Sequence, residues 1–322
     1  MIRELCDEKG EKMTTKIVLI VGPTAVGKTD LSLNLACKFN GEIISGDSMQ
    51  VYHKLDIGTA KATSKERSLV PHHLIDVREI EQRFSVAEFV LECRHLINEI
   101  TAKGSLPFIV GGTGFYLQAL LDNFQLGNDQ YEDSERIREK WYQFAKQNGK
   151  KQLWQELKKV DPNAAVGIPP NNERRIIRAL EVFEKTGKQF SKQNDRPTKE
   201  FLPLVIGLNT NREVLYQRIE KRVDLMLSNG LLEEARWLYD AGGESLPAGK
   251  GIGYKELFPY FKGKIPLAQA VANIKKDSRH YAKRQLTWFR NKMDVTWFDI
   301  ISDKNNADKI TEVVKNWIET KE

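Results

Sequence analysis

The fold of this chain is decided by residues 16–29, which read Lys16-Ile17-Val18-Leu19-Ile20-Val21-Gly22-Pro23-Thr24-Ala25-Val26-Gly27-Lys28-Thr29. The apolar run 17–21 predicts a buried strand, and it leads into the spacing Gly, four residues, Gly-Lys-Thr. Small residues at this spacing let the chain turn sharply, so successive backbone N–H groups point at phosphate oxygens. We therefore expect a phosphate-binding loop at residues 22–29.

Two residues at the end of this loop add charge and a hydroxyl. Lys28 would place a positive charge beside the phosphates. Thr29 would open the next helix, whose positive N-terminal end faces the anion, and would offer its hydroxyl to a Mg²⁺ ion. The following residues are apolar at helical density, in agreement with a helix. The loop alone does not identify the phosphate compound, and a glycine-containing turn without a ligand is the alternative.

The composition is that of a soluble, globular protein. The chain has 322 residues, 40% hydrophobic and 29% charged, which is enough for about two domains. Its longest apolar runs are of strand length, so we expect no membrane partner. The first fifteen residues are acidic and lack an apolar core, which argues against a secretory signal. The three cysteines are scattered, so we expect no disulfide framework or zinc site, and a cytoplasmic protein.

Strand-like and helical segments alternate through the first 120 residues, which predicts an α/β fold with a parallel sheet. The expected strands are 16–22, 41–46, 73–77 and 106–111. Ser85 and Glu88 have the spacing of a capping box, which predicts a helix from there to residue 102. Glycines at 111–114 then repeat the strand-to-helix arrangement before a helix at 116–121, at the edge of the sheet where such folds bind ligands.

The composition changes between residues 125 and 197, where charge density rises and strand-like apolar runs are no longer found. We expect helices at 134–147, 151–160 and 171–187, followed by a strand at 201–208 that completes the sheet. Later helices are expected at 211–228, 230–241 and 266–291. The predicted domains are a catalytic core, residues 1–124 and 198–322, and a helical insertion, residues 125–197.

Positive charge is concentrated near the C-terminus. Residues 250–292 carry a net charge of +9 in a chain whose total is +6. A helix at 266–291 would gather apolar residues on one face and cations on the other, namely Lys276, Arg279, Lys283 and Arg290. Such a stripe is typical of a phosphate-backbone contact surface, which favours nucleic acid as the partner. An acidic membrane surface or a plain solvated helix face are the alternatives.

Asp47 follows the second expected strand and would lie beside the phosphate loop. In a phosphate-loop hydrolase or kinase, such an aspartate helps to hold Mg²⁺. In a transferase it could take a proton from a nucleophile. It could also simply cap the turn that follows. Its position alone leaves these roles open.

The stretch 45–61 around Asp47 resembles the signature of the tRNA dimethylallyltransferases, the tRNA isopentenyl-transfer family. The similarity continues in order over nearly the whole chain. It includes residues 71–77, 84–89, 111–116, 172–182, 218–223, 251–254 and 283–290. The family relationship implies a P-loop NTPase-like core. It also implies that the loop holds the pyrophosphate of dimethylallyl diphosphate and not ATP.

The resemblance further implies a reaction in which N6 of an adenine beside the tRNA anticodon attacks C1 of the allyl group. Asp47 would be the general base, and Thr113 would form a hydrogen bond at the reacting centre. Thr24, Lys28 and Arg222 would stabilise the diphosphate, with Mg²⁺ near Thr29. A carboxylate that accepts the proton and cations that offset the leaving-group charge are physically consistent with this reaction. The adenine would have to be flipped out of its stack to reach the pocket.

The expected contacts with the tRNA anticodon stem-loop come from three segments. They are Asp47, Ser48, Met49 and Gln50 beside the base pocket; Arg174, Arg175 and Arg178 in the insertion; and Lys283, Arg284 and Arg290 in the basic helix. The arginines of the insertion could instead be ordinary solvated cations on a helix. The five histidines are too dispersed for a metal cluster, and we expect His72 and His73 to serve strand packing or local hydrogen bonds. We expect a monomer.

Three other functions compete with this interpretation. A small-molecule kinase could use the same loop for ATP, but it would leave the basic segment without a role. An isopentenyltransferase that acts on free adenine nucleotides would share the chemistry, with less need for the insertion and the basic surface. A non-catalytic RNA-binding module would not explain Lys28 and Asp47 side by side.

Overall fold

The structure is a computed structural model that describes residues 14–122, 131–192 and 200–320. The chain divides into two compact units. One contains Met1–Leu121 and Thr198–Glu322, and the other contains Asp122–Pro197. The first unit is built on a sheet whose strands are β1 (Thr15–Val21), β2 (Gly41–Ser45), β3 (His72–His73), β4 (Leu106–Gly111), β5 (Phe201–Leu208) and β6 (Thr296–Phe298).

All neighbouring strands of this sheet are parallel, in the order β3-β2-β4-β1-β5-β6. The predicted parallel α/β sheet is therefore confirmed. The β1 strand lies between β4 and β5, with Val18 opposite both Phe108 and Leu204. Residues 17–21 are fully buried because helices cover both faces of the sheet. This explains why the strand reads as a continuous apolar run.

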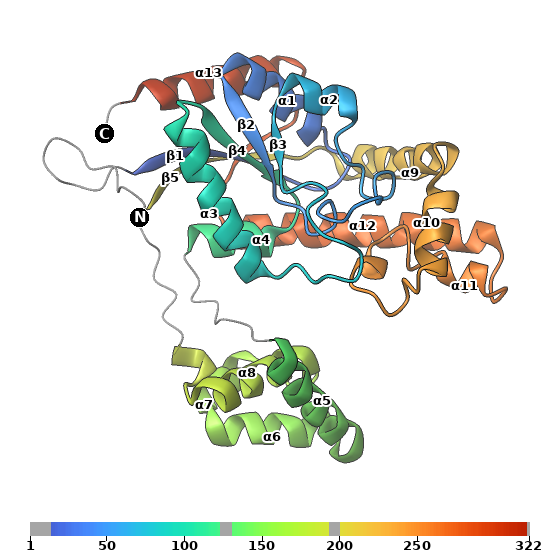
Figure 1. The fold of residues 1–322 in the computed structure, drawn as a ribbon. Helices are drawn as coiled ribbons and strands as arrows, with labels where there is room; N and C mark the ends of the chain where they lie inside the picture. Colours follow the sequence, from blue (N-terminus) through green and yellow to red (C-terminus); the bar gives the residue numbers. More distant parts are fainter. Residues whose placement is uncertain (1–13, 123–130, 193–199, 321–322) are drawn as a thin grey trace, which may run out of the picture. The chain divides into compact units, whose positions relative to one another are not determined.

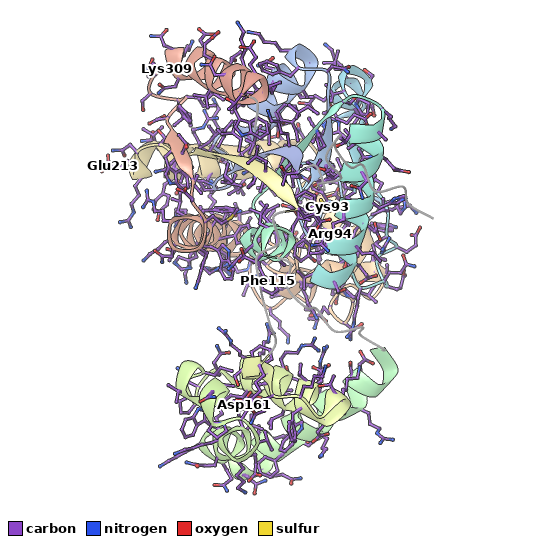
Figure 2. The ribbon with its side chains drawn as sticks, turned by 90° about the vertical axis from the view of Figure 1, so that its left-hand side faces the viewer. Cys93, Arg94, Phe115, Asp161, Glu213 and Lys309 are labelled. Carbon is purple, nitrogen blue, oxygen red and sulfur yellow. The ribbon has the colours of Figure 1, made fainter. Side chains whose placement is uncertain are left out.

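Figure 1 shows α1 and α13 on one face of the sheet and α3, α4 and α12 on the other. The helices of this unit are α1 (Lys28–Lys38), α2 (Ser64–Leu69), α3 (Val86–Ala102), α4 (Gly114–Leu121), α9 (Arg212–Ser228), α10 (Leu231–Asp240), α11 (Phe258–Phe261), α12 (Leu267–Lys292) and α13 (Asn305–Glu319), with a 3₁₀ turn at Ala248–Lys250. Cys93 and Arg94 lie on α3, and Phe115 lies at the start of α4 (Figure 2). Cys37 and Cys93 are free thiols, and Cys6 lies outside the described residues.

Local signals predicted α3 well. The Ser85 side chain accepts a hydrogen bond from the Glu88 N–H, and the Glu88 carboxylate accepts one from the Ser85 N–H. This reciprocal pair is the predicted capping box. The following strand, β4, and the later strand β5 also lie where the sequence places them.

The expected strand 73–77 is wrong beyond its first residue, because β3 ends at His73. Leu74 and Asp76 have φ angles of 58° and 54°, which turn the chain away from the sheet. The two histidines have the local roles expected of them. His73 Nε2 lies 2.7 Å from the Glu42 carboxylate, and His72 Nδ1 lies 2.7 Å from the Val70 carbonyl oxygen.

The second unit is entirely helical in its described residues. It contains α5 (Tyr131–Asn148), α6 (Lys150–Val160), α7 (Pro162–Gly167), α8 (Glu173–Thr186) and a 3₁₀ turn at Phe190–Lys192. Asp161, labelled in Figure 2, is 1% exposed and accepts hydrogen bonds from the N–H groups of Ala164 and Ser191. It thereby caps α7, a short helix that the periodicity did not reveal. Across the described part of the chain, no helix is long and apolar enough to cross a membrane.

Candidate functional site

Residues 22–29 join β1 to α1 in the sharp turn that their spacing predicts. Gly22 and Gly27 have φ angles of 143° and 95°, which favour glycine. A Cβ on Gly22 would also lie 2.4 Å from the Leu208 carbonyl oxygen on β5. No side chain caps the start of α1, so its first N–H groups remain available to an anion. The loop therefore has the geometry of a phosphate cradle.

Lys28 and Arg222 bring two positive charges to this loop. The Lys28 Nζ donates to the carbonyl oxygens of Gly22 at 3.1 Å and Pro23 at 2.7 Å. Burial, followed by the charge of Arg222, lowers the pKa of Lys28 to about 7, and Asp47 opposes this shift. Burial likewise lowers the pKa of Arg222, again opposed by Asp47. The structure thus brings together three predicted site residues from three separate segments.

Asp47 lies two residues beyond the end of β2, and its Oδ1 accepts hydrogen bonds from the N–H groups of Met49 at 2.8 Å and Gln50 at 3.4 Å. The turn-capping contact considered for this residue is therefore present. Both bonds use Oδ1, and no hydrogen bond to Oδ2 is found in the described segments. A carboxylate held by one oxygen can accept a proton on the other.

Thr113 is connected to the segment that carries Asp47. Its Oγ1 accepts a hydrogen bond from the Ser48 N–H at 3.2 Å, and its own N–H donates to the Gly46 carbonyl oxygen at 3.3 Å. A Cβ on Gly111 would lie 2.3 Å from that same carbonyl oxygen, so only glycine allows this approach. Because β2 and β4 are neighbours, the loops that follow them meet at one edge of the sheet.

Two residues of α12 that were not predicted as site residues face this same edge. Gln285 is 5% exposed, and its side-chain amide bonds to the backbone of both the phosphate loop and the loop after β4. Burial and the charge of Asp47 raise the pKa of the Tyr281 phenol, which contacts Thr113 and Gln285. A polar residue on the buried face of an otherwise apolar helix stripe was the available signal for Gln285.

Of the predicted catalytic and diphosphate-binding residues, Thr24 to Thr29, Asp47 and Arg222 line a cavity of about 840 Å³, whereas Gly22, Pro23 and Thr113 are not among its lining residues. Its walls come from the phosphate loop, the segment after β2, the glycine loop after β4, α9 and α12. Basic residues outnumber acidic ones along it: Lys28, Arg218, Lys221, Arg222, Lys250, Lys255 and Arg284 against Asp30 and Asp47. Apolar wall residues include Ile43, Ile75, Val110, Val223, Met226 and Ile252. The cavity therefore suits an anionic ligand that also carries an apolar group.

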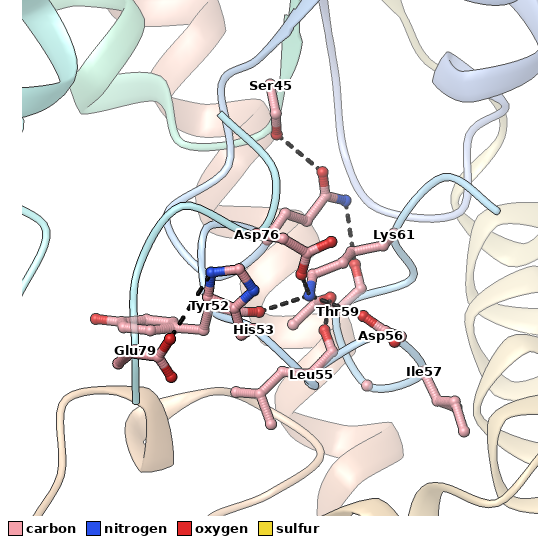
Figure 3. Close-up of polar contacts among 12 residues, drawn as sticks. Ser45, Tyr52, His53, Leu55, Asp56, Ile57, Thr59, Lys61, Asp76 and Glu79 are labelled. Carbon is pink, nitrogen blue, oxygen red and sulfur yellow. Dashed lines mark hydrogen bonds and ion pairs between the residues drawn. The ribbon is translucent and has the colours of Figure 1, made fainter. Parts of the chain in front are cut away.

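The segment between Asp47 and Lys61 is held in shape by its own polar groups (Figure 3). The Ser45 hydroxyl donates to Gln50 Oε1 at 2.8 Å, and the Gln50 amide donates to the Thr59 carbonyl oxygen at 3.2 Å. The buried Lys61 ammonium contacts the carboxylates of Asp56 and Asp76. The side-chain amide of Gln50, a predicted tRNA contact, is thus occupied by bonds within the protein, although Gln50 lines the cavity together with Ser48 and Met49.

Glu234 on α10 secures the same segment from outside. Its carboxylate accepts hydrogen bonds from three consecutive backbone N–H groups, those of residues 56, 57 and 58, at 2.8–2.9 Å. It also accepts one from the hydroxyl of Tyr254, which is fully buried. Sequence reasoning missed this residue because 176–178 positions separate it from the three backbone N–H groups, and no local pattern indicates such a contact.

The cations predicted to contact tRNA differ in how they are engaged. Arg174 and Arg175 on α8 are exposed, while Arg178 bonds to the Glu181 carboxylate at 2.8 Å. On α12, the exposed lysines and arginines are Lys276, Lys283, Arg284, Arg290 and Lys292. The predicted stripe of cations is wrong at Arg279, because the Arg279 guanidinium is paired with the Glu220 carboxylate of α9 at 2.5 Å. Of the α12 residues predicted to bind tRNA, Arg284 lines the cavity, and Lys283 and Arg290 lie outside its wall.

Thr29 is the predicted metal ligand. It is exposed at the start of α1 and lines the cavity. The searched residues, those that the structure describes, contain no cluster of three or more His, Cys, Asp or Glu side chains that could hold a metal ion. A single hydroxyl fits Mg²⁺ only where phosphate oxygens and water complete the coordination shell.

Comparisons with known proteins show the family to which this chain is similar over nearly its whole length. A family model described as IPP transferase matches residues 50–292. A protein of Limosilactobacillus fermentum named tRNA dimethylallyltransferase is 60% identical over 304 residues, which cover 94% of this chain and 99% of that protein. A protein of the same name from Enterococcus faecalis is 51% identical over 307 residues, which cover 95% of this chain and 99% of that protein.

Solved structures are similar over the same length. The full-length tRNA isopentenylpyrophosphate transferase of Bacillus halodurans has a TM-score of 0.71 and 46% identity, and the match covers 94% of this chain and 96% of that one. A eukaryotic dimethylallyltransferase described as acting on tRNA has a TM-score of 0.80 and 31% identity, and the match covers 95% of this chain and 80% of that one.

Proposed function

Because this chain belongs to the IPP transferase family, we propose that it transfers a dimethylallyl group from dimethylallyl diphosphate to a tRNA. The acceptor is N6 of the adenosine on the 3′ side of the anticodon. The products are N6-isopentenyladenosine in the tRNA and free pyrophosphate. This assignment combines the activity named for the relatives with the chemistry that the cavity offers.

The observation that carries the proposal is the meeting of Lys28, Arg222 and Asp47 in one cavity. Two cations and a row of backbone N–H groups suit a diphosphate, while a carboxylate suits a nucleophile that must lose a proton. A kinase would need the same loop, but the apolar wall residues of the cavity give a prenyl chain a place to bind.

In the proposed reaction, the adenine N6 attacks C1 of the dimethylallyl group, and the bond between C1 and the diphosphate oxygen breaks. Asp47 accepts the proton that N6 loses as the new C–N bond forms. Thr24, Lys28, Arg222 and the backbone N–H groups of the loop stabilise the negative charge that grows on the leaving diphosphate. Thr113 holds the segment of Asp47 through Ser48 and offers its hydroxyl at the reacting centre.

A Mg²⁺ ion held by the Thr29 hydroxyl and by diphosphate oxygens would supply further positive charge to the leaving group. The residues of this chain would then bind and orient the diphosphate through the loop. We propose Mg²⁺ as the cofactor on the chemistry of this donor set.

The acceptor adenine reaches Asp47 only if it leaves the stack of the anticodon loop. Ser48 and Met49 border the pocket that would receive it. The exposed cations Lys283, Arg284 and Arg290 of α12, together with Arg174 and Arg175 of the helical unit, would bind phosphates of the anticodon stem-loop. We further propose that the protein acts as a monomer in the cytoplasm.

One assay tests the proposal. Purified protein is mixed with Mg²⁺, dimethylallyl diphosphate and unmodified tRNA, with AMP or ATP as the alternative acceptor in parallel reactions. Mass spectrometry should show the gain of one five-carbon unit on an anticodon-loop adenosine. A gain on the free nucleotide, with none on tRNA, would instead assign the protein to the free-nucleotide isopentenyltransferases. Light scattering of the same sample measures its molar mass, which should be that of a monomer.

A further inference from the structure

Gln285 on α12 bridges two loops of the site through the two ends of one side chain. Its Oε1 accepts a hydrogen bond from the Thr24 N–H at 3.1 Å, and its Nε2 donates to the Gly112 carbonyl oxygen at 3.0 Å. A backbone N–H can only donate and a carbonyl oxygen can only accept, so these partners determine the orientation of the amide. Gln285 therefore links the phosphate loop to the loop after β4.

The bond to Gly112 is buried, and the bond to Thr24 is partly buried at the cavity wall. Gln285 is 5% exposed, and a Cβ added to Gly112 would lie 2.0 Å from its Nε2. The glycine at position 112 is thus the residue that allows the amide to reach the backbone. A bond between two buried polar groups leaves each of them unsatisfied when its partner is removed, which makes this link costly to break.

The link extends from Gly112 to Asp47. Gly111 packs against the carbonyl oxygen of Gly46. The N–H group of Gly46 donates a hydrogen bond to the carbonyl oxygen of Val110 at 2.8 Å. Thr113 then accepts from Ser48, the residue after Asp47. Glycines at close approach leave little room for the loops to slide, so the position of one backbone determines that of the next. A continuous path of contacts connects Thr24, Gln285 and the segment that carries Asp47.

We propose that Gln285 is a positioning residue, which sets the separation between the diphosphate cradle and the carboxylate that accepts the proton. The proposal rests on the function proposed above and adds a role for a residue of the cavity wall to which that mechanism assigns no part in binding or proton transfer. It also separates the buried Gln285 from its neighbours Lys283 and Arg284, which are exposed. Gln285 acts on the rate of transfer and not on the binding of tRNA.

Two substitutions test this role. Gln285→Met keeps the approximate length of the side chain and removes both hydrogen bonds. Gln285→Glu keeps the acceptor for Thr24 and turns a carboxylate oxygen toward the Gly112 carbonyl oxygen. Because displacements of about 1 Å at a reacting centre can cost about 100-fold in rate, we expect kcat for tRNA prenylation to fall by about that factor in each variant. The KM for tRNA and its dissociation constant should stay at the wild-type values.

The matched control is Gln269→Met, at an exposed position on the same helix, which should behave as wild type. Thermal unfolding is recorded for all variants, and if the Met variant does not fold, the Glu variant decides. Wild-type kcat in a folded Gln285 variant overturns the positioning role. So does a loss of tRNA affinity that accounts for the loss of rate, because that would make Gln285 a tRNA contact. If the wild type and the control also fail to prenylate tRNA, the proposed function itself is wrong.

Discussion

The Lys28 ammonium lies 2.7 Å from the carbonyl oxygen of Pro23 and donates a hydrogen bond to it, so the lysine of the phosphate loop closes back on its own loop. Burial, together with the nearby charge of Arg222, lowers the pKa of this lysine to about 7. The charge state of Lys28 in the free protein therefore changes near neutral pH. The binding of a diphosphate at this loop should therefore depend on pH.

A bound diphosphate would raise the pKa of Lys28, because an opposite charge favours the ammonium form. Binding above about pH 7 should then take up a proton, and the affinity for dimethylallyl diphosphate should fall as the pH rises through this range. Calorimetry in two buffers of different ionisation enthalpy measures the proton uptake. Lys28→Met should bind more weakly and lose the uptake. An uptake that persists in this variant would assign the proton to another group.

Asp47→Asn keeps the shape of the side chain and removes its ability to accept a proton. We expect kcat for tRNA prenylation to fall by about 100-fold to 10,000-fold, the usual contribution of a general base. The affinity for tRNA should be retained, because it depends on distant cations. Single-turnover kinetics and filter binding measure the two quantities. Asp308→Asn, at an exposed position on α13, is the control. Near-wild-type turnover in Asp47→Asn would rule out the general-base role.

Glu234→Gln tests how the segment beside the pocket is held. The carboxylate accepts four hydrogen bonds, three of them from the backbone N–H groups of residues 56–58. A glutamine keeps the length of the side chain. Its NH₂ group, however, would face N–H or O–H groups that need an acceptor. We expect faster amide hydrogen exchange at residues 56–58 and a loss of about 1–3 kcal/mol in unfolding free energy. The adjacent exposed Glu233→Gln should change neither, and equal effects in both variants would contradict the clamp.

Glu181 is the buried carboxylate of the helical unit, with a fully buried side chain bonded by Arg138 and Arg178. Burial alone would raise the pKa of Glu181, but its bonds to Arg138 and the charge of Arg178 leave it below the ordinary value. Its contribution to stability is thus present above the ordinary pKa of a glutamate and is lost as the pH falls through the lowered one. Glu181→Leu should cost about 1–3 kcal/mol, because Arg138 and Arg178 each lose a charged hydrogen-bond acceptor.

Thermal and denaturant unfolding measure this loss. The control is Glu184→Leu, which breaks an exposed pair with Lys140 at 2.7 Å and should cost less than about 1 kcal/mol. Similar losses in the two variants would show that burial of Glu181 does not decide its contribution.

Lys283→Ala combined with Arg290→Ala tests the exposed cations of α12. Each phosphate contact that is lost should reduce the salt dependence of tRNA binding by about one unit in the slope of log K against log salt, so the double variant should lose about two. The control is Lys304→Ala with Lys309→Ala at the exposed start of α13. An unchanged slope in the α12 variant would make this face an ordinary solvated helix surface.

Several elements could be read from the sequence because their signals are local. The strand, loop and helix of residues 16–38 and the capping box of α3 depend on neighbours within a few positions. Other elements carried no such signal. The β6 strand has three residues and pairs only at the edge of the sheet, and the short α2 and α7 offered too little periodicity to be predicted. The α13 helix was overlooked, although its residues Ile310, Val314 and Trp317 have helical spacing.

The sequence by itself determined the phosphate loop, the parallel sheet around it and the place of Asp47 after the second strand, because backbone turns and strand burial are encoded by adjacent residues. Only the tertiary structure decided that Gln285 bonds to the loop at Thr24 and that Arg279 pairs with Glu220. The partners of Gln285 are 261 positions apart from it in one case and 173 in the other. Contacts over such separations depend on how the helices pack on the sheet, and no local pattern specifies that packing.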